Sequence, residues 1–377
     1  MKYLILNIFI LYFILFSSSN CSFQISLFNE INKSKKGQNL IISPLSIFQI
    51  LSLTANGARD QTQLEMVQTL QNDDVENLNS INYEILETTK NFKTVEIANA
   101  VMSKFIPIQE FLDISEKYCA PFEELKSAEQ VNGWCSEKTH GKIPKLLDEL
   151  NADIVMILLN AVYFKGEWKN KFNEKSTKQK AFYNKGTEMK EIDTMVKLSH
   201  FSYYEDDKIQ AIEIPYEKDN MTALIILPRE DIDINKYITS LSSNKDGLNA
   251  LIKKLIYAKV NLELPKFELE FSTSLTDVLN DMGMETAFTD NADFSGLREE
   301  GNLKIDDVIH KTYLKVDEEG TEAAAITGIT IIPTSVRPDV EIVYQMKVNR
   351  PFLFFLRNIK LPADNDLLFM SKIEIIE

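Results

Sequence analysis

The stretch that decides the fold is residues 316–335, Val-Asp-Glu-Glu-Gly-Thr-Glu-Ala-Ala-Ala-Ile-Thr-Gly-Ile-Thr-Ile-Ile-Pro-Thr-Ser. It begins with charged residues, continues through a run of small residues and ends with β-branched ones. Such side chains fit the pleated surface of a β-sheet, and Gly328 is the weak point. Alternate residues from Thr321 to Ile331 would form one face that is small at its start and aliphatic at its end. The composition therefore predicts a segment that lies exposed as a loop and can also become a strand.

The motif Glu318-Glu-Gly-Thr-Glu-Ala-Ala-Ala325 resembles the reactive-loop hinge of inhibitory serpins. Many other segments resemble serpin motifs in the family's order and at its spacing, so the resemblance covers about residues 39 to 373. These segments include Asn39-Leu-Ile-Ile-Ser-Pro-Leu-Ser46, Thr139-His-Gly-Lys-Ile143, Asn160-Ala-Val-Tyr-Phe-Lys-Gly-Glu-Trp168, Leu264-Pro-Lys-Phe267, Ala292-Asp-Phe-Ser-Gly296 and Val348-Asn-Arg-Pro-Phe-Leu-Phe-Phe355.

The resemblance implies an α+β serpin fold of about eight to nine helices around three β-sheets. A reactive-centre loop is expected to lie exposed at about residues 318–340. The length of 377 residues would by itself suggest two domains. No linker or low-complexity stretch divides the chain, and we expect residues 22–377 to form a single serpin domain.

Three groups of functional residues follow from the resemblance. The hinge would let the loop enter the central sheet, the breach is the place where insertion starts, and the shutter is a polar cluster beneath the sheet. Buried polar groups need partners, so the shutter residues are expected to bond to one another. The hinge comprises Glu318, Gly320, Thr321, Glu322, Ala323, Ala324 and Ala325; the breach Trp168, Lys266 and Glu318; and the shutter Ser43, Ser46, Asn160 and His310.

The family's usual spacing from the hinge places the bond that a protease cuts between Thr334 and Ser335. A small uncharged residue after Pro333 suits elastase-like proteases better than trypsin-like ones. Arg337 is the alternative for a trypsin-like enzyme. It precedes Pro338, however, which hinders such enzymes, and cutting there would lengthen the inserting arm by three residues. The preferred partner is therefore an elastase-like serine protease.

The resemblance implies a suicide inhibitor of serine proteases, in which the cut loop inserts into the central sheet while the protease remains attached. The alternative is a noninhibitory serpin that acts as a carrier or a chaperone. Small residues at Thr321, Ala323 and Ala325 favour inhibition, because bulky, charged or proline residues would be expected in a noninhibitory hinge. Ile326 departs from the small residue usual at its position, and it would face outward.

An enzyme is not expected. The chain has three histidines, His140, His200 and His310, and no zinc-protease, nucleophile-elbow or phosphate-loop motif. The family places His310 in the shutter, where its role is structural. We expect neither a metal nor a cofactor.

The N-terminus predicts a secretory signal at residues 1–21, with cleavage near residues 19–22. Lys2 is followed by an apolar run that ends in serines and is too short to span a membrane comfortably. A secreted, extracellular protein would make the sequons at Asn32 and Asn220 candidates for glycosylation. Cys119 and Cys135 could pair in an oxidising compartment or remain two separate thiols.

The net charge of −15 argues against binding to nucleic acid. The region corresponding to the heparin-binding helix of some serpins, residues 71–89, has five acidic residues and no lysine or arginine, so a heparin site there is not expected. No later stretch is apolar enough to span a membrane, and we expect a monomer.

Several elements can be placed from local patterns. Ser43-Pro44 before an apolar run predicts the start of a buried helix, with Ser43 as a possible cap. Near-continuous apolar runs predict buried strands. These strands are expected at residues 156–164, 221–227, 259–271, 351–357 and 366–376.

Overall fold

The computed structural model describes residues 22–151, 154–244, 247–300, 303–321 and 342–377. This part of the chain forms nine α-helices and sixteen β-strands. None of its helices has the length and apolar character needed to cross a membrane. The helices are α2 (Phe23–Ser34), α3 (Pro44–Gly57), α4 (Asp60–Thr69), α5 (Val75–Thr89), α6 (Gln109–Lys117), α7 (Ala128–Lys138), α8 (Ile234–Ser242), α9 (Gly247–Lys254) and α10 (Thr276–Asp281).

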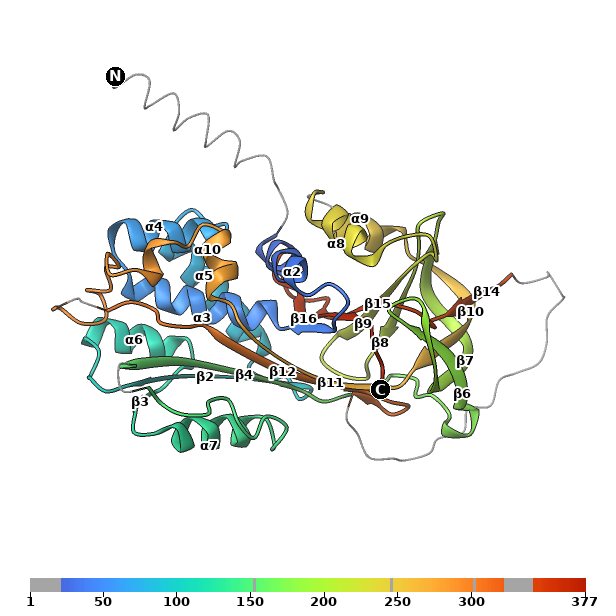
Figure 1. Ribbon diagram of the computed structural model, residues 1–377, viewed down its shortest axis with the longest axis horizontal. Coiled ribbons are helices and arrows are strands. Elements are labelled where there is room, and N and C mark those ends of the chain that lie inside the picture. Colours follow the sequence, from blue (N-terminus) through green and yellow to red (C-terminus); the bar gives the residue numbers. More distant parts are fainter. Residues whose placement is uncertain (1–21, 152–153, 245–246, 301–302, 322–341) are drawn as a thin grey trace, which may run out of the picture.

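The largest sheet has nine strands and forms the end of the molecule drawn at the right of Figure 1. Strand β7 is eighteen residues long and pairs with β6, β10 and β8. It therefore connects the two halves of this sheet. The members are β1 (Leu40–Ile42), β6 (Lys178–Asn184), β7 (Glu188–Glu205), β8 (Ile209–Pro215), β9 (Met221–Pro228), β10 (Ile256–Pro265), β14 (Val343–Lys347), β15 (Phe352–Asn358) and β16 (Leu367–Ile373).

The remaining strands form three smaller hydrogen-bonded groups in the described residues. One has the order β3-β2-β4, the second pairs β11 with β12, and the third pairs β13 with β5. Strands β4 and β12 contact each other but belong to different groups. The bounds are β2 (Val95–Ser103), β3 (Phe122–Glu124), β4 (Met156–Phe164), β5 (Gly166–Glu167), β11 (Phe267–Ser274), β12 (Ile309–Val316) and β13 (Gly320–Thr321).

Helices cover both faces of this smaller assembly (Figure 1). Helices α3, α4, α5 and α10 lie on one side of β2, β4 and β12, and α7 lies on the other. Each side has its own apolar core: Phe48 and Leu51 of α3 belong to one, and Val131 and Trp134 of α7 to the other. A third apolar core packs against the large sheet and includes Trp168 and Phe354.

The expected α+β plan with eight to nine helices is confirmed. The strands do not form three separate sheets. Strand β7 joins two of the expected sheets into the nine-stranded one, and the third is divided into β3-β2-β4 and β11-β12, because β4 and β12 do not pair. The predicted strand over 259–271 is two strands in the structure. Strand β10 ends at Pro265 and β11 begins at Phe267. Proline lacks the amide hydrogen that would continue a ladder.

Candidate functional site

The hinge begins with a tight turn after β12. The amide of Asp317 donates to the carbonyl of Gly320 at 2.9 Å, which reverses the chain. Gly320 and Thr321 then pair antiparallel with Glu167 and Gly166 as β13 and β5. The first two residues beyond the turn are therefore already in a strand.

Gly320 is required by this geometry. Its φ of +152° is one that residues with a side chain rarely adopt. A Cβ atom at this position would lie 2.0 Å from the carbonyl oxygen of Gly166 and 2.8 Å from the Cα of Glu167. Any side chain would therefore push β13 away from β5.

Thr321 is buried beside β5, with 2 % of its surface exposed. Its hydroxyl lies 2.9 Å from the hydroxyl of Tyr216, at the end of β8. Burial raises the pKa of Tyr216, so the phenol stays neutral and can share a proton with Thr321. Thr321 thus belongs to the face that the alternation of residues predicts to point inward.

Trp168 directly follows β5 and bonds to the turn, as expected of a breach residue. Its indole nitrogen donates to the carbonyl of Asp317 at 2.9 Å, and its amide donates to the carbonyl of Glu319, also at 2.9 Å. The ring stacks on Tyr216 with 4.3 Å between centroids. The aromatic pair therefore joins the turn to the end of β8.

Glu318 and Lys266 form the ion pair expected from the sequence, with 2.9 Å between Nζ and Oε2. Thr177 donates a second hydrogen bond to this carboxylate at 2.6 Å. Burial raises the pKa of Glu318, but the bonds from Thr177 and Lys266 and the charge of Lys266 outweigh it, and the net pKa is lowered. The carboxylate is therefore held charged although only 6 % of the residue is exposed.

The first residues of the expected loop are not exposed, and the bounds of the loop stay a prediction. Glu318, Gly320 and Thr321 are all buried, because the turn directs the chain back against β5. The other hinge residues, Glu322, Ala323, Ala324 and Ala325, lie outside the described residues, as do Thr334, Ser335 and Arg337 of the predicted cleavage region.

The shutter residues separate into two bonded groups. His310 of β12 is buried, and its Nε2 accepts the amide hydrogen of Ser43 at 3.0 Å. Ser46 donates to the carbonyl of Ser43 at 3.0 Å. Asn160 instead donates to Asn99 of β2, its cross-strand neighbour, at 2.7 Å. The sequence thus placed His310 correctly beside Ser43, while the partner of Asn160 was missed.

The His310 ring is neutral, because burial lowers its pKa to about 4. A ring that accepts at Nε2 carries its proton on Nδ1. Ser43 supplies its backbone amide here, and its hydroxyl makes no capping bond to α3, so the expectation of a Ser43 cap is wrong. Pro44 does occupy the first turn of α3, as predicted.

Other predicted residues lie outside this region. Asn32 has only 2 % of its surface exposed, which disfavours a glycan, whereas Asn220 is exposed. Cys119 is exposed and Cys135 is buried within α7, and both are free thiols. The described residues contain no group of three or more His, Cys, Asp or Glu side chains that could hold a metal ion.

Two contacts at the breach could not be found from the motifs. Tyr216 and Thr177 are far from the hinge in sequence, yet both bond to it. Tyr216 lies at the end of an apolar strand, where a buried aromatic residue is ordinary. The one local sign of a special position is that Tyr216 directly follows Pro215, where the apolar strand ends.

Comparison with known proteins agrees with this geometry. Residues 18–375 match the family described as Serpin (serine protease inhibitor). This chain is a serpin. Iripin-2 of Ixodes ricinus is 33% identical over 361 residues, covering 89% of this chain and 87% of the relative. Leukocyte elastase inhibitor of Sus scrofa is 31% identical over 383 residues, covering 95% of this chain and 98% of the relative.

Solved serpin structures match along almost the whole length. The thermophilic serpin tengpin in its native state has a TM-score of 0.84 and 30% identity, covering 95% of this serpin and 94% of tengpin. Thyroxine-binding globulin in complex with thyroxine has a TM-score of 0.83 and 25% identity, covering 96% and 99%. The neighbours of this serpin thus include both a protein named as an inhibitor and one named for a bound ligand.

Proposed function

We propose that this serpin inhibits serine proteases by covalent trapping, with insertion of the cut loop between β4 and β12. The observation that carries the proposal is the short pair of β13 and β5, which follow the ends of β12 and β4, two strands that do not pair with each other. A strand added there would bond to both sides and satisfy open backbone groups. Insertion would therefore continue a strand whose first two residues already exist.

The chemistry begins at the predicted bond between Thr334 and Ser335. The serine oxygen of the protease attacks the carbonyl carbon of Thr334, the peptide bond breaks, and the new amino group of Ser335 leaves with a proton. The protease is then joined to Thr334 as an ester. Fourteen residues from Thr321 to Thr334 would span about 45 Å as a strand. Insertion would move the ester far from its original position before water could hydrolyse it.

We infer that the target is an elastase-like serine protease and that the serpin itself catalyses no reaction. Thr334 is small and uncharged, and one relative is named leukocyte elastase inhibitor. His310 accepts the backbone amide of Ser43, His140 contacts Glu96 at 3.2 Å, and His200 stacks on Tyr257, so none of these contacts pairs a histidine with a nucleophilic side chain. Cleavage at Arg337 would point instead to a trypsin-like enzyme.

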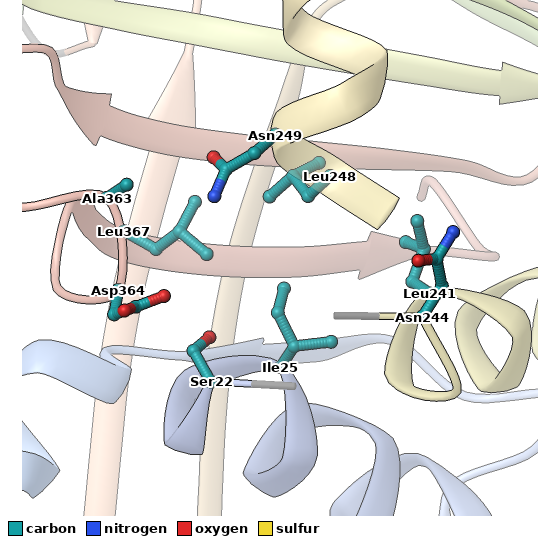
Figure 2. A pocket seen from close by; sticks show the side chains of 9 residues that line it. All are labelled: Ser22, Ile25, Leu241, Asn244, Leu248, Asn249, Ala363, Asp364 and Leu367. Carbon is teal, nitrogen blue, oxygen red and sulfur yellow. The ribbon is translucent and has the colours of Figure 1, made fainter. Parts of the chain in front are cut away.

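The cavity between α2, α8 and α9 gives little support to the alternative, a carrier; the groove of about 700 Å³ beside β14 is larger but open to solvent. Figure 2 shows the lining of the cavity, in which Ile25, Leu248 and Leu367 supply apolar side chains and Asn249 and Asp364 supply polar ones. Its volume is about 20 Å³, whereas sites for small organic ligands measure roughly 300–1,000 Å³. This cavity accommodates a water molecule rather than a hormone-sized ligand.

Export from the cell is part of the proposal. The charged and apolar pattern of residues 1–21 supports a signal peptide, and Asn220 is the better placed of the two sequons. Expression in a secretory host, followed by N-terminal sequencing of the medium and treatment with a glycosidase, tests both points. Retention of the intact N-terminus inside the cell would contradict export.

The test of inhibition is incubation with pancreatic elastase and, separately, trypsin, followed by denaturing gel electrophoresis. We expect a stable adduct with elastase and a fragment released from Ser335, identified by mass spectrometry. A trypsin adduct with cleavage after Arg337 would reverse the specificity. Complete cleavage without any adduct would favour the noninhibitory alternative.

A further inference from the structure

Exposed apolar side chains gather on the outer face of β7, β10 and β14, at the edge of the nine-stranded sheet. Leu198, Tyr257 and Val343 are 57%, 78% and 40% exposed. The register places Lys259 of β10 between His200 of β7 and Val343 of β14. His200 stacks on Tyr257 with 5.2 Å between ring centroids. We call Leu198, His200, Tyr257, Lys259 and Val343 the sheet-edge patch.

The charge around this patch is opposite in sign to that of the whole chain. Lys259 and Lys347 stand on the same outer face, since residues of a strand alternate between faces. Glu263, the acidic residue on this face of β10, lies opposite Lys347 and is also paired with Lys180 at 2.6 Å, so the lysines outnumber the carboxylate. The patch is therefore locally basic in a chain of net charge −15. Such a surface suits a partner with an acidic and apolar surface.

An open groove of about 700 Å³ beside β14 continues the same surface, since Val343 and Lys347 of the outer face also line it. Tyr344 lines it and packs against Tyr203, with 5.1 Å between ring centroids. Arg229 and Arg350 line it together with Glu205 and Glu230, and Arg229 pairs with Glu205 at 2.9 Å. A body that lies against β14 would meet Lys259 and Lys347 on the outer face, and Tyr344 with groups of both charges in the groove.

The patch is continuous with the predicted protease-binding segment. Thr334 precedes Val343 by nine residues, which span at most about 30 Å when extended. A protease domain of about 230 residues has a diameter of roughly 45 Å from its radius of gyration. A protease bound at Thr334 therefore reaches the edge strand β14. Its surface beside the active-site cleft would lie against the patch.

We propose that the sheet-edge patch is a second contact for the target serine protease, one that engages an acidic and apolar surface beside its cleft. The inference rests on the proposed inhibitory function and deepens it. The reactive loop selects the bond that is cut, and the patch raises the rate at which the two proteins associate. Basic residues add electrostatic steering, which acts mainly on the association rate.

The test compares a Leu198→Ala/Tyr257→Ala variant with a matched control, Leu64→Ala/Ile106→Ala. The control removes side chains that are 48% and 78% exposed, near α4 and α6 at the opposite end of the molecule (Figure 1). The probe is whichever protease, pancreatic elastase or trypsin, forms the adduct with the unaltered serpin. We expect the association rate to fall about 5- to 20-fold for the patch variant only. The number of serpin molecules consumed per protease should stay unchanged, because the hinge is intact.

A second variant, Lys259→Gln/Lys347→Gln, tests the charge. Its association rate should depend less on salt than that of the unaltered serpin. Adduct formation at equal rates by the unaltered serpin, the patch variant and the lysine variant would overturn the second contact and leave inhibition standing. Absence of any adduct would overturn inhibition and the second contact together. A dimer that the patch variant dissociates would assign the patch to self-association instead.

Discussion

The two ends of the gap between β4 and β12 are held by different chemistry. At the breach, an ion pair, stacked aromatic rings and a short strand hold the hinge, and charged carboxylates are present. At the shutter, a neutral imidazole accepts one backbone amide from the start of α3. The breach therefore fixes β13 beside β5, while the shutter joins β12 to the start of α3 through a single hydrogen bond. The following predictions separate these two roles.

The largest effect is expected from Gly320→Ala. Its Cβ would collide with Gly166, so β13 could not pair with β5 and the hinge would lose its starting position. We expect the number of serpin molecules consumed per inhibited protease to rise at least about tenfold, because slow insertion lets the ester hydrolyse. Titration of protease activity measures this number. Gly37→Ala is the control, since Gly37 also has a positive φ but a Cβ there would meet no atom within 4 Å.

His310 predicts an acid sensitivity of the shutter. Its folded pKa of about 4 lies below the ordinary value of 6.5, so the unfolded chain binds the proton more readily. His310 does not change the free energy of unfolding above pH 6.5. As the pH decreases from 6.5 towards 4, it lowers that free energy by up to about 3 kcal/mol. Urea unfolding at pH 7 and pH 4.5 measures the loss.

His310→Gln should flatten this pH dependence, whereas His140→Gln, which removes an exposed ring, should leave it unchanged. If the free energy of unfolding fell equally with pH in the unaltered protein and in His310→Gln, His310 would not be the cause of the acid sensitivity.

Lys266→Gln should weaken the breach by about 2 kcal/mol. The substitution leaves the buried carboxylate of Glu318 with Thr177 as its remaining side-chain partner. Because the folded pKa of Glu318 is lowered, its contribution is present above the ordinary value of 4.5 and is lost as the pH falls below it. The stability difference between variant and parent should therefore shrink at low pH. A difference that stayed constant from pH 7 to pH 3 would argue against the ion pair as its cause.

The smallest effect is expected from Tyr216→Phe. This change removes the hydroxyl that bonds to Thr321 and keeps the ring that stacks on Trp168, so stability should fall by about 1 kcal/mol. Tyr183→Phe, at a more exposed ring, is the control. Thermal unfolding measures both. A loss as large as that of Lys266→Gln would mean that the breach depends on the Tyr216 hydroxyl as much as on its ion pair.

The sequence predicted which residues belong to this site better than the contacts that join them. Lys266 and Glu318 were paired, and His310 was placed beside Ser43, because the family motifs carry those positions. Tyr216 and Thr177 were missed, since contacts across more than 100 residues leave no local periodicity. Alternation assigned Thr321 to the small face of a strand, but its burial in the intact chain was not predicted. The turn at Asp317 that causes this burial left no sign, because four polar and glycine residues fit many turns.

The long strand β7 divides the molecule into two parts of unequal stiffness. Eighteen consecutive residues cover about 60 Å and bond to three partners, so the nine-stranded sheet has few places at which it can open alone. Structural change is then confined to the smaller assembly of β2, β4, β11 and β12. Amide hydrogens should accordingly exchange slowly along β7 and markedly faster where β4 faces β12, even before any protease is present.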